Sequence, residues 1–427
     1  MNSVLIYISE LSPRANYTFE VLLKSLLGIS FETTTNISDF NNYSGAKFSY
    51  GIKSVANELH FEATSLLFEK NIDNKFYQNK NIDEAFAIKN KAHFGIDIFA
   101  ASFFLLSRYE EYNQPNFNYT QSILHRSKLL QHPVVNEWTM ELKKILQLHF
   151  SDLQFIANKY KIIPTIDVDR AFAFKARNIF TTIGGLIKDG LKFNFAEIIV
   201  RLKVLANYET DPFDVFEKIE KINKSASLRA IYFVHCGSYN GVDKNINLNH
   251  PLFKTAIQKI GKRNLVGIHP SIKSITETSL LPKEIALLQS VLYEQKITKS
   301  RQHFIELKFP NSYKILLTNE ITEDYTMGYA DEIGFRAGIC NSYYWYDVEN
   351  EKQTALVIHP FCLMEATYQY FKNNDTKAFL ADAEIISNNV KNVNGELFFV
   401  WHNQSFSEIY EYKGWSKIYP YFLATII

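Results

Sequence analysis

Beyond Tyr160 the chain alternates short apolar runs with stretches of helical periodicity. A strand followed by a helix is the repeating unit of a parallel sheet, because the helix returns the chain to the edge where the next strand begins. Six runs read as strands: IIPTID, RAIYFVH, NLVGIH, RQHF, ALVIHP and LFFVWH. Six or more such units predict a βα barrel or a doubly wound sheet in this part of the chain.

The first part of the chain, up to about residue 158, follows a less regular pattern. The run VLIYIS reads as a strand, and NYTFEVLLKSLL has helical periodicity with Asn16 as a possible cap. AHFGIDIFAASFFLLSRYEEY reads as a buried central helix, and VVNEWTMELKKILQLHF as an amphipathic one. We therefore expect a smaller α/β domain over residues 1–158, followed by a second domain over residues 159–427.

Length and composition agree with a folded chain of two or three domains. The chain has 427 residues, of which 46% are hydrophobic, so there is ample apolar material for a core. The net charge of +1 argues against strong electrostatic attraction to nucleic acid or to acidic membranes. The chain contains no GxGxxG, GxxxxGK or GxSxG motif, which disfavours a nucleotide site and a serine hydrolase.

The features that report on location favour a reducing compartment. Three cysteines do not make a disulfide framework. The segment MNSVLIYISELSPR lacks a basic stretch and reads as a first strand rather than a signal peptide. The most apolar later segment is interrupted by Asp97 and is too short to span a bilayer. We therefore expect a cytoplasmic protein with no membrane span.

Acidic and imidazole side chains stand where the predicted strands end. They are Asp167, Asp169, His235, His269, His303, His359 and His402. The chain has 11 histidines in all, so this placement is denser than composition suggests. Because active sites of βα barrels lie at the carboxyl ends of the strands, we expect these side chains to converge on one face. For His235 and His359, an ordinary core or loop position is the preferred interpretation.

The pair Asp167 and Asp169 poses a physical question. On a strand, residues i and i+2 point to the same face, so the two carboxylates repel each other. A metal ion, an arginine or a shared proton can compensate such a pair. The plain alternative is that these residues form a strand-end turn or cap a helix.

The order of these segments resembles the polysaccharide deacetylases, the family-four carbohydrate esterases with NodB homology. TIDVD resembles the first motif of that family, RAIYFVHCG its second strand, and GIHPSIKS its second motif. RQHF falls where the third motif has an arginine, and FFVWHN resembles the last motif. The whole chain is similar to a bacterial two-domain subgroup, in which an uncharacterised N-terminal domain containing AASFFLLSRYEEY precedes a deacetylase domain carrying GYADEIGFRAG.

The resemblance implies a distorted (β/α) barrel and a metal-dependent hydrolase that removes acetyl groups from a carbohydrate. Asp169 and His269 would be ligands of a divalent metal, with zinc as the expected ion. Asp167 would take a proton from the attacking water, and Arg301 would orient that carboxylate. His402 would protonate the leaving group.

One position departs from the family pattern. The second motif usually has another histidine four residues after the first, and here that position is Lys273. A site with three protein ligands then needs a substitute, for which His303 is the candidate. It lies two residues from Arg301, so both side chains can face one side if the segment is extended. A weaker site, a different metal or no metal at all are the alternatives.

The segment GYADEIGFRAGICNSYYWYD combines glycines, charges and aromatic rings. Such a loop suits a carbohydrate, because Tyr and Trp stack on sugar faces while charged groups bind hydroxyls. The predicted substrate-binding residues are Asp331, Arg336, Tyr344 and Trp345. The alternative is a long loop that packs over the barrel mouth or against the N-terminal domain.

Two other functions fit the same residues. A deacetylase-like protein without activity, which binds a glycan or a partner protein, is suggested by Lys273. A glycoside hydrolase would pair Asp167 or Asp169 with Glu332 or Glu365, because that reaction needs two carboxyl groups ~5–10 Å apart. The sequence does not indicate an oligomeric state.

Overall fold

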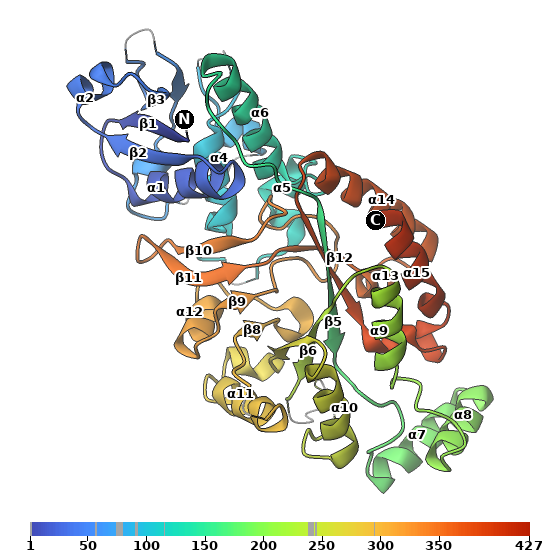
Figure 1. Cartoon of the computed structure of the whole chain (residues 1–427). Helices are drawn as coiled ribbons and strands as arrows, with labels where there is room; N and C mark the ends of the chain where they lie inside the picture. The colour runs from blue at the N-terminus through green and yellow to red at the C-terminus, as the bar shows by residue number, and fades with distance from the viewer. Residues whose placement is uncertain are drawn as a thin grey trace.

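The protein is a mixed α/β structure with two sheets, seen here in a computed structural model (Figure 1). The structure describes residues 2–55, 58–73, 80–89, 93–114, 116–237, 243, 246–293 and 295–427. The smaller sheet is parallel, in the order β2-β1-β3-β4. Its strands are β1 (Ser3–Ile8), β2 (Ser30–Thr34), β3 (Lys47–Gly51) and β4 (His60–Glu62).

The larger sheet has the strand order β10-β11-β9-β8-β7-β6-β5-β13-β12. Its strands are β5 (Lys161–Val168), β6 (Ile231–His235), β7 (Leu265–His269), β8 (Lys299–Ser300), β9 (Glu323–Asp324), β10 (Tyr343–Asp347), β11 (Lys352–Ile358), β12 (Phe361–Met364) and β13 (Glu396–His402). Every pairing is parallel except the antiparallel pair β10 and β11. The predicted parallel βα arrangement is confirmed to this extent.

The barrel itself is not found. Within the described ranges no pairing joins β12 to β10, so the sheet is open at both edges. The run RQHF is also not a strand, because β8 ends at Ser300 and a 3₁₀ turn, η7 (His303–Ile305), follows. The strands β8 and β9 are short, and each pairs over one or two residues only.

Helices cover both parts of the molecule. Those of the first part are α1 (Pro13–Phe19), the π-helical turn η1 (Glu20–Leu26), α2 (Ile37–Asn42), α3 (Ile82–Ala85), α4 (Ile98–Leu106), α5 (Ile123–Arg126) and α6 (Val134–His149). Those of the second part are α7 (Ile179–Leu191), α8 (Phe195–Leu205), α9 (Phe216–Ser225), α10 (Pro251–Gly261), α11 (Leu280–Val291), α12 (Asn311–Thr318), α13 (Glu365–Phe371), α14 (Thr376–Asn392) and α15 (Trp415–Ile426). Among the described residues, none of these is long and apolar enough to cross a bilayer.

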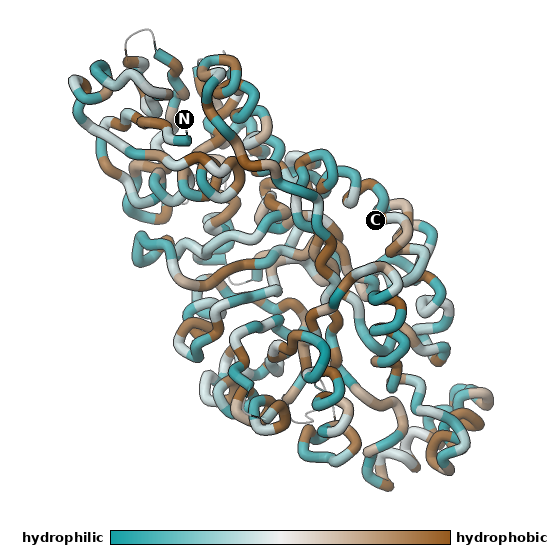
Figure 2. Tube along the Cα trace, in the orientation of Figure 1, coloured by the Kyte–Doolittle hydropathy of each residue, from teal (hydrophilic) through white to brown (hydrophobic). Residues whose placement is uncertain are grey.

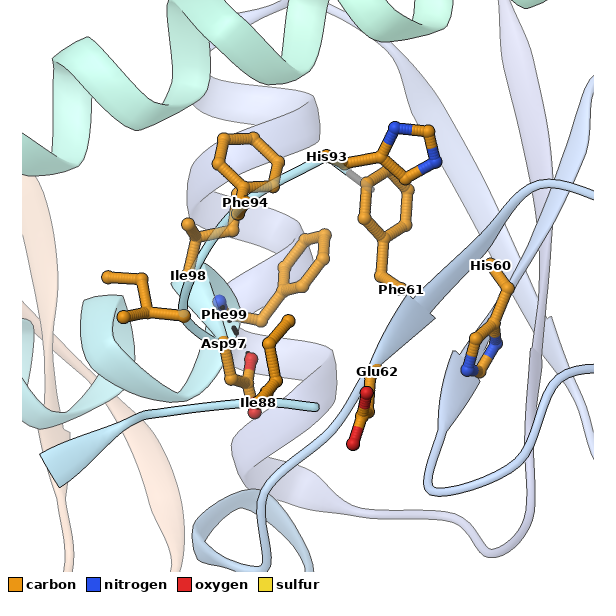
Figure 3. A pocket seen from close by; sticks show the side chains of 10 residues that line it. His60, Phe61, Glu62, Ile88, His93, Phe94, Asp97, Ile98 and Phe99 are labelled. Atoms are coloured by element: carbon orange, nitrogen blue, oxygen red, sulfur yellow. Dashed lines mark hydrogen bonds between the residues drawn. The ribbon is translucent and has the colours of Figure 1, made fainter. Parts of the chain in front are cut away.

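The expected buried helix in the first part is confirmed as α4, in which every residue is buried. Asp97 caps it, accepting hydrogen bonds from the backbone N–H groups of Phe99 and Ala100. The hydroxyl of Tyr50 donates to the same carboxylate. Figure 3 shows Asp97 beside the rings of Phe99 and its neighbours, around a small pocket of about 10 Å³. Asp97, the charged residue that interrupts the apolar run, is therefore the N-cap of α4.

The first helix of the chain starts earlier than the sequence suggests. Ser12 caps α1 by accepting a hydrogen bond from the backbone N–H of Ala15, and Pro13 occupies the first turn. Proline suits that place because its missing N–H would have no partner inside the helix. Asn16, the expected cap, therefore lies within the helix.

The two parts are joined by a buried cluster of four charges. The carboxylate of Glu111 accepts hydrogen bonds from Arg108 Nε at 2.8 Å and from Arg336 Nη2 at 2.5 Å. Glu110 pairs with Arg108 at 3.0 Å, so two carboxylates balance two guanidinium groups. Burial alone would raise the pKa of Glu111. The positive charges of Arg336 and Arg108 outweigh this effect and hold the pKa below its usual value. Residues far apart in the sequence are thereby locked together.

Replacing Glu111 by Gln should lower the stability of the whole chain by about 3–5 kcal/mol, because two buried guanidinium groups lose a shared carboxylate. Urea unfolding of the purified protein measures this difference. Glu141→Gln, which removes an exposed pair with Lys144, is the matched control and should change stability by less than ~1 kcal/mol. Equal effects of the two substitutions would contradict a structural role for this cluster.

Candidate metal centre and the surrounding cavity

The carboxyl ends of the central strands meet around one cavity. β5 lies between β13 and β6, and the register sets His402 beside Asp167. In the next pair of strands, the register sets His235 at the end of β6 beside His269 at the end of β7. A cavity of about 920 Å³ opens at this edge, and the side chains lining it include Asp167, Asp169, His269, His303 and His402. The parallel register thus gathers residues that lie more than 200 positions apart.

Asp169, His269 and His303 form a compact group of ligand atoms, all within 4.8 Å of one another. Asp169 Oδ1 lies 3.2 Å from His269 Nε2 and 3.8 Å from His303 Nε2. In a tetrahedral zinc site with bonds of ~2.0–2.1 Å, neighbouring ligand atoms are about 3.3 Å apart. The group therefore has the composition and the approximate spacing of three ligands of one metal ion.

The hydrogen bonds behind the two imidazoles fix which nitrogen faces the group. His269 Nδ1 lies 2.5 Å from the carbonyl oxygen of Arg301, and His303 Nδ1 lies 2.8 Å from the carboxylate of Asp243. Each of these acceptors requires a proton on Nδ1, so a neutral ring presents its Nε2 lone pair towards Asp169. Metal-binding histidines show this arrangement, in which the other ring nitrogen donates to a carbonyl or carboxylate.

The Nε2 lone pairs of His269 and His303 and the carboxylate of Asp169 are all electron-rich. They repel one another unless a positive charge lies between them. Asp169 Oδ1 is buried, and no described residue donates a well-formed hydrogen bond to it. The pKa of Asp169 lies well below its usual value, because the positive charge of His402 and the imidazoles of His269 and His303 outweigh the effect of burial. Burial lowers the pKa of His269, but the charges of Asp167 and Asp169 outweigh it and raise that pKa. A proton or a divalent cation meets this demand, and the donor set fits zinc.

Arg301 neutralises the second carboxylate. Its Nη1 lies 3.3 Å from Asp167 Oδ1, and its Nε donates to the carbonyl of Tyr325 at 3.1 Å. The guanidinium is fully buried between the rings of Phe233 and Phe361, at 4.7 Å and 5.4 Å from their centroids. The absence of a side chain at position 267 leaves room for the Phe233 ring, because a Cβ there would lie 2.7 Å from it. The arginine is therefore held rigidly against Asp167.

His402 is positioned by a carboxylate from the neighbouring strand end. Glu365, which is fully buried at the start of α13, accepts hydrogen bonds from the backbone N–H of His402 at 2.7 Å and from its Nδ1 at 3.0 Å. The hydroxyl of Ser405 donates to the same oxygen. Burial lowers the pKa of His402, but the charges of Glu365 and Asp169 outweigh it and raise the pKa to about 10. The imidazole therefore carries a proton at neutral pH, with Nε2 turned towards Asp169.

The remaining strand-end histidines divide into two cases. His235 is buried next to the group of Asp169, His269 and His303. Its Nδ1 lies 3.0 Å from the carbonyl oxygen of His269. Burial and the neighbouring imidazoles lower its pKa to about 4, so this ring is neutral. Together with Asp243 and His303 it forms a second group of possible ligands. His359 does not line the cavity and stacks on Tyr325 with 4.3 Å between ring centroids.

Lys273 does not enter the cavity. Its side chain is exposed on the turn that follows β7, and it is absent from the cavity lining. His303 reaches Asp169 from the 3₁₀ turn after β8, although the segment is not extended as expected. Of these two side chains, His303 lies beside Asp169 and His269, and Lys273 does not.

The predicted substrate-binding residues do not line the cavity. Arg336 is buried in the charge cluster with Glu111, and Trp345 is buried in the core. Tyr344 is exposed on β10, and Asp331 is half-buried in the loop before it. The loop packs against the first part of the chain, where the backbone N–H of Val135 donates to the carbonyl of residue 338. Its charges and rings therefore build an internal contact, which is the alternative that the sequence left open.

The sequence does not suggest either of the two carboxylates as the partner of a histidine in the site. Glu365 lies 37 positions before His402, and Asp243 lies 60 positions before His303. Glu365 follows an apolar run and is named from the sequence only as a possible carboxylate of a glycoside hydrolase. Asp243 stands in a polar stretch with no such signal.

Residues 4–151 match the model of a family of unknown function, DUF7033. Comparison with curated proteins finds no match. Among solved structures, a "putative polysaccharide deacetylase" from Mycobacterium smegmatis is 13% identical, with 64% of this chain and 85% of that chain covered and a TM-score of 0.40. A 4-alpha-glucanotransferase from Thermococcus litoralis is 10% identical, with 64% and 38% covered and a TM-score of 0.37. These TM-scores are too low to transfer a fold or a residue role.

Zinc added to the metal-free protein should bind at a single high-affinity site. His269→Ala and His303→Ala should each lose it, whereas His359→Ala, which removes a strand-end histidine outside the cavity, should keep it. Titration calorimetry with elemental analysis measures the stoichiometry. Binding should weaken in acid, because protons compete with the metal for the imidazole lone pairs. Retention of zinc by both ligand variants would contradict this assignment.

Proposed function

We propose that the protein is a metal-dependent hydrolase that removes acetyl groups from a carbohydrate. The observation that carries the proposal is the arrangement at the end of β5. Asp169, His269 and His303 bring three possible ligand atoms together. Asp167 Oδ2 lies 3.9 Å from His269 Nε2, and His402 Nε2 lies 3.9 Å from Asp169 Oδ2. The order of the surrounding motifs resembles that of the polysaccharide deacetylases, which supports the choice of reaction.

The reaction needs a polarised carbonyl, a nucleophilic water and a proton for the leaving group. Zinc held by Asp169, His269 and His303 would polarise the acetyl carbonyl and lower the pKa of water. Asp167 would accept the proton of the attacking water, and Arg301 pairs with that carboxylate at 3.3 Å. The bond from the acetyl carbon to water oxygen forms, and the bond to the sugar nitrogen or oxygen breaks.

His402 would complete the reaction as the acid. Its proton goes to the sugar nitrogen or oxygen as the bond to the acetyl carbon breaks, and acetate leaves. Glu365 holds the ring by its Nδ1, so that Nε2 is the nitrogen directed at the cavity. A cation bound to Asp169 would offset the charge of that carboxylate, but the charge of Glu365 would still favour the imidazolium.

The cavity suits a carbohydrate in size and position. Its volume of about 920 Å³ lies at the upper end of the range of small-molecule sites, ~300–1,000 Å³, which leaves room for several sugar units. The exposed rings of Tyr370 and Phe371 line it and offer faces for stacking. These rings replace the loop residues that the sequence suggested for this role. We also propose that the catalytic unit begins near residue 159, after the part that matches DUF7033.

The positions of other side chains disfavour the two alternatives. A non-catalytic protein would have a side chain such as Lys273 in place of the metal, and that side chain is exposed outside the cavity. A glycoside hydrolase would need Glu332 or Glu365 facing the sugar. Glu332 pairs with Lys372 at 2.5 Å, and Glu365 is buried beneath His402; neither lines the cavity.

Asp167→Asn should lower the rate of acetate release by about 10²–10⁴-fold, because an amide cannot accept the proton of water. Zinc content should stay close to that of the wild type, since Asp169 is the ligand. Thermal stability should fall, because the buried guanidinium of Arg301 loses its carboxylate, so rates are compared at a temperature where both proteins are folded. Acetate release from a panel of N- and O-acetylated oligosaccharides measures the effect. Asp331→Asn, a carboxylate outside the cavity, is the control. Full activity in the Asp167 variant would disprove its role as base.

The activity should fall at high pH as His402 loses its proton. Burial lowers the pKa of His402, Glu365 and Asp169 raise it, and bound zinc would offset the contribution of Asp169. Glu365→Gln removes a charge that raises this pKa, so the alkaline limb of the pH–rate profile should move to lower pH. The expected direction follows because the acid form is present below the pKa and lost above it. An alkaline limb that stays in place, in a variant with unchanged thermal stability, would contradict the pairing of His402 with Glu365.

A further inference from the structure

The helices α7 and α8 form a hairpin whose polarity is inverted. In a water-soluble protein the apolar stripe of a surface helix faces the core, and the charged side faces solvent. Here the fully buried side chains are Asp189 in α7 and Glu197, Arg201 and Val204 in α8. Three of these four are charged, so the hairpin turns its polar side towards the protein.

Ion pairs attach this polar side to the C-terminal segment. Arg201 Nη2 lies 2.6 Å from Asp189 Oδ2, and the hydroxyl of Tyr410 donates to the same carboxylate. Lys413 Nζ lies 2.7 Å from Glu197 Oε1. The two helices pack closely at position 185, where a Cβ would lie 2.6 Å from the guanidinium of Arg201. The orientation of the hairpin is thus fixed by specific contacts.

Apolar side chains cover the outer side of the hairpin. In α7 the stripe repeats every four residues, at Ile179, Ile183, Ile187 and Leu191. In α8 and its flanks it continues through Phe193, Phe195, Ile199, Leu202, Leu205 and Tyr208. Phe180 is 83% exposed, and Leu191 is 77% exposed.

This concentration is unlike the rest of the surface. Of the 26 exposed large hydrophobic side chains among the described residues, 11 lie between Ile179 and Tyr208, which is 30 positions of the chain. Figure 2 shows brown segments on these two helices, which stand apart from the larger sheet at the lower right of Figure 1. An apolar face of this extent on a projecting hairpin indicates an environment other than water.

The charge of the hairpin identifies that environment. Residues 175–209 contain six Lys or Arg against three Asp or Glu. Asp189 pairs with Arg201, Glu197 with Lys413 and Glu209 with Lys203. The exposed side chains of Lys188 and Lys192 lie beside the apolar stripe and line the cavity. Apolar residues flanked by lysines are typical of helices that lie in the interface of an anionic bilayer.

We propose that the α7–α8 hairpin binds the surface of an anionic phospholipid bilayer. The apolar stripes enter the boundary between headgroups and acyl chains, and Lys188 and Lys192 meet the phosphate layer. Because these lysines line the cavity that contains Asp167 and His402, the bound protein opens its cavity at the headgroup level. The small net charge of the chain does not oppose this, since attraction depends on charge within a Debye length of the surface. The proposal rests on the hairpin alone and stands whether or not the chain is a deacetylase.

Flotation of the full chain with lipid vesicles tests the proposal. The protein should float with vesicles of equal parts phosphatidylglycerol and phosphatidylcholine, and much less with phosphatidylcholine alone. Ile187→Glu combined with Leu191→Glu should lower the bound fraction by roughly tenfold or more, because two apolar side chains no longer insert. Ile52→Glu combined with Leu148→Glu makes the same chemical change at exposed positions in the first part, and should leave binding unchanged.

Three results would overturn the proposal. One is no flotation of the wild type with anionic vesicles. Another is equal flotation of the wild type and the hairpin variant, or equal flotation with both lipid mixtures. The third is that a second copy of the chain, rather than lipid, covers the apolar side of the hairpin. In that case the wild type would not bind vesicles, and sedimentation velocity without lipid would show a dimer for the wild type and a monomer for the hairpin variant.

Discussion

The structure depends on how two carboxylates are compensated at the end of β5. Asp167 is buried near the end of β5. Asp169 follows just after the strand, and both side chains line the cavity. Burying such charges is costly unless each one meets opposite charge. Asp167 meets the guanidinium of Arg301, and Asp169 meets the imidazoles of His269 and His303. The elements that supply these partners, β7 and the segments after β8, are thereby held at fixed positions around the strand.

A second set of contacts gives each partner a direction. The carbonyl of Arg301 orients His269, and Asp243 orients His303, so both rings turn Nε2 to the same point. Glu365 does the same for His402. These contacts commit each ring to one role before any ligand arrives, which is what a preorganised hydrolytic site requires. Arg301 therefore acts twice, through its side chain on Asp167 and through its backbone on His269.

The strands, and the meeting of the residues that follow them at one edge, could largely be predicted because the sheet is mostly parallel. Apolar runs mark the strands, and parallel strands place their carboxyl ends at one edge, so residues after each run must meet. The partners of those residues could not be predicted in the same way. Glu365 and Asp243 act through contacts across 37 and 60 positions that no local pattern records. The sequence does not distinguish the two positions open to Arg336, because a loop rich in charges and rings can bind sugar or pack against Glu111, and here it packs.

The proposed function requires that Asp169, His269 and His303 bind one metal ion. Anomalous diffraction at the zinc edge, from crystals grown with zinc, tests this most directly. One strong peak is expected, ~2.0–2.1 Å from the Nε2 atoms of His269 and His303 and close to Oδ1 of Asp169. A peak between His235, Asp243 and His303, or no peak within the cavity, would contradict it.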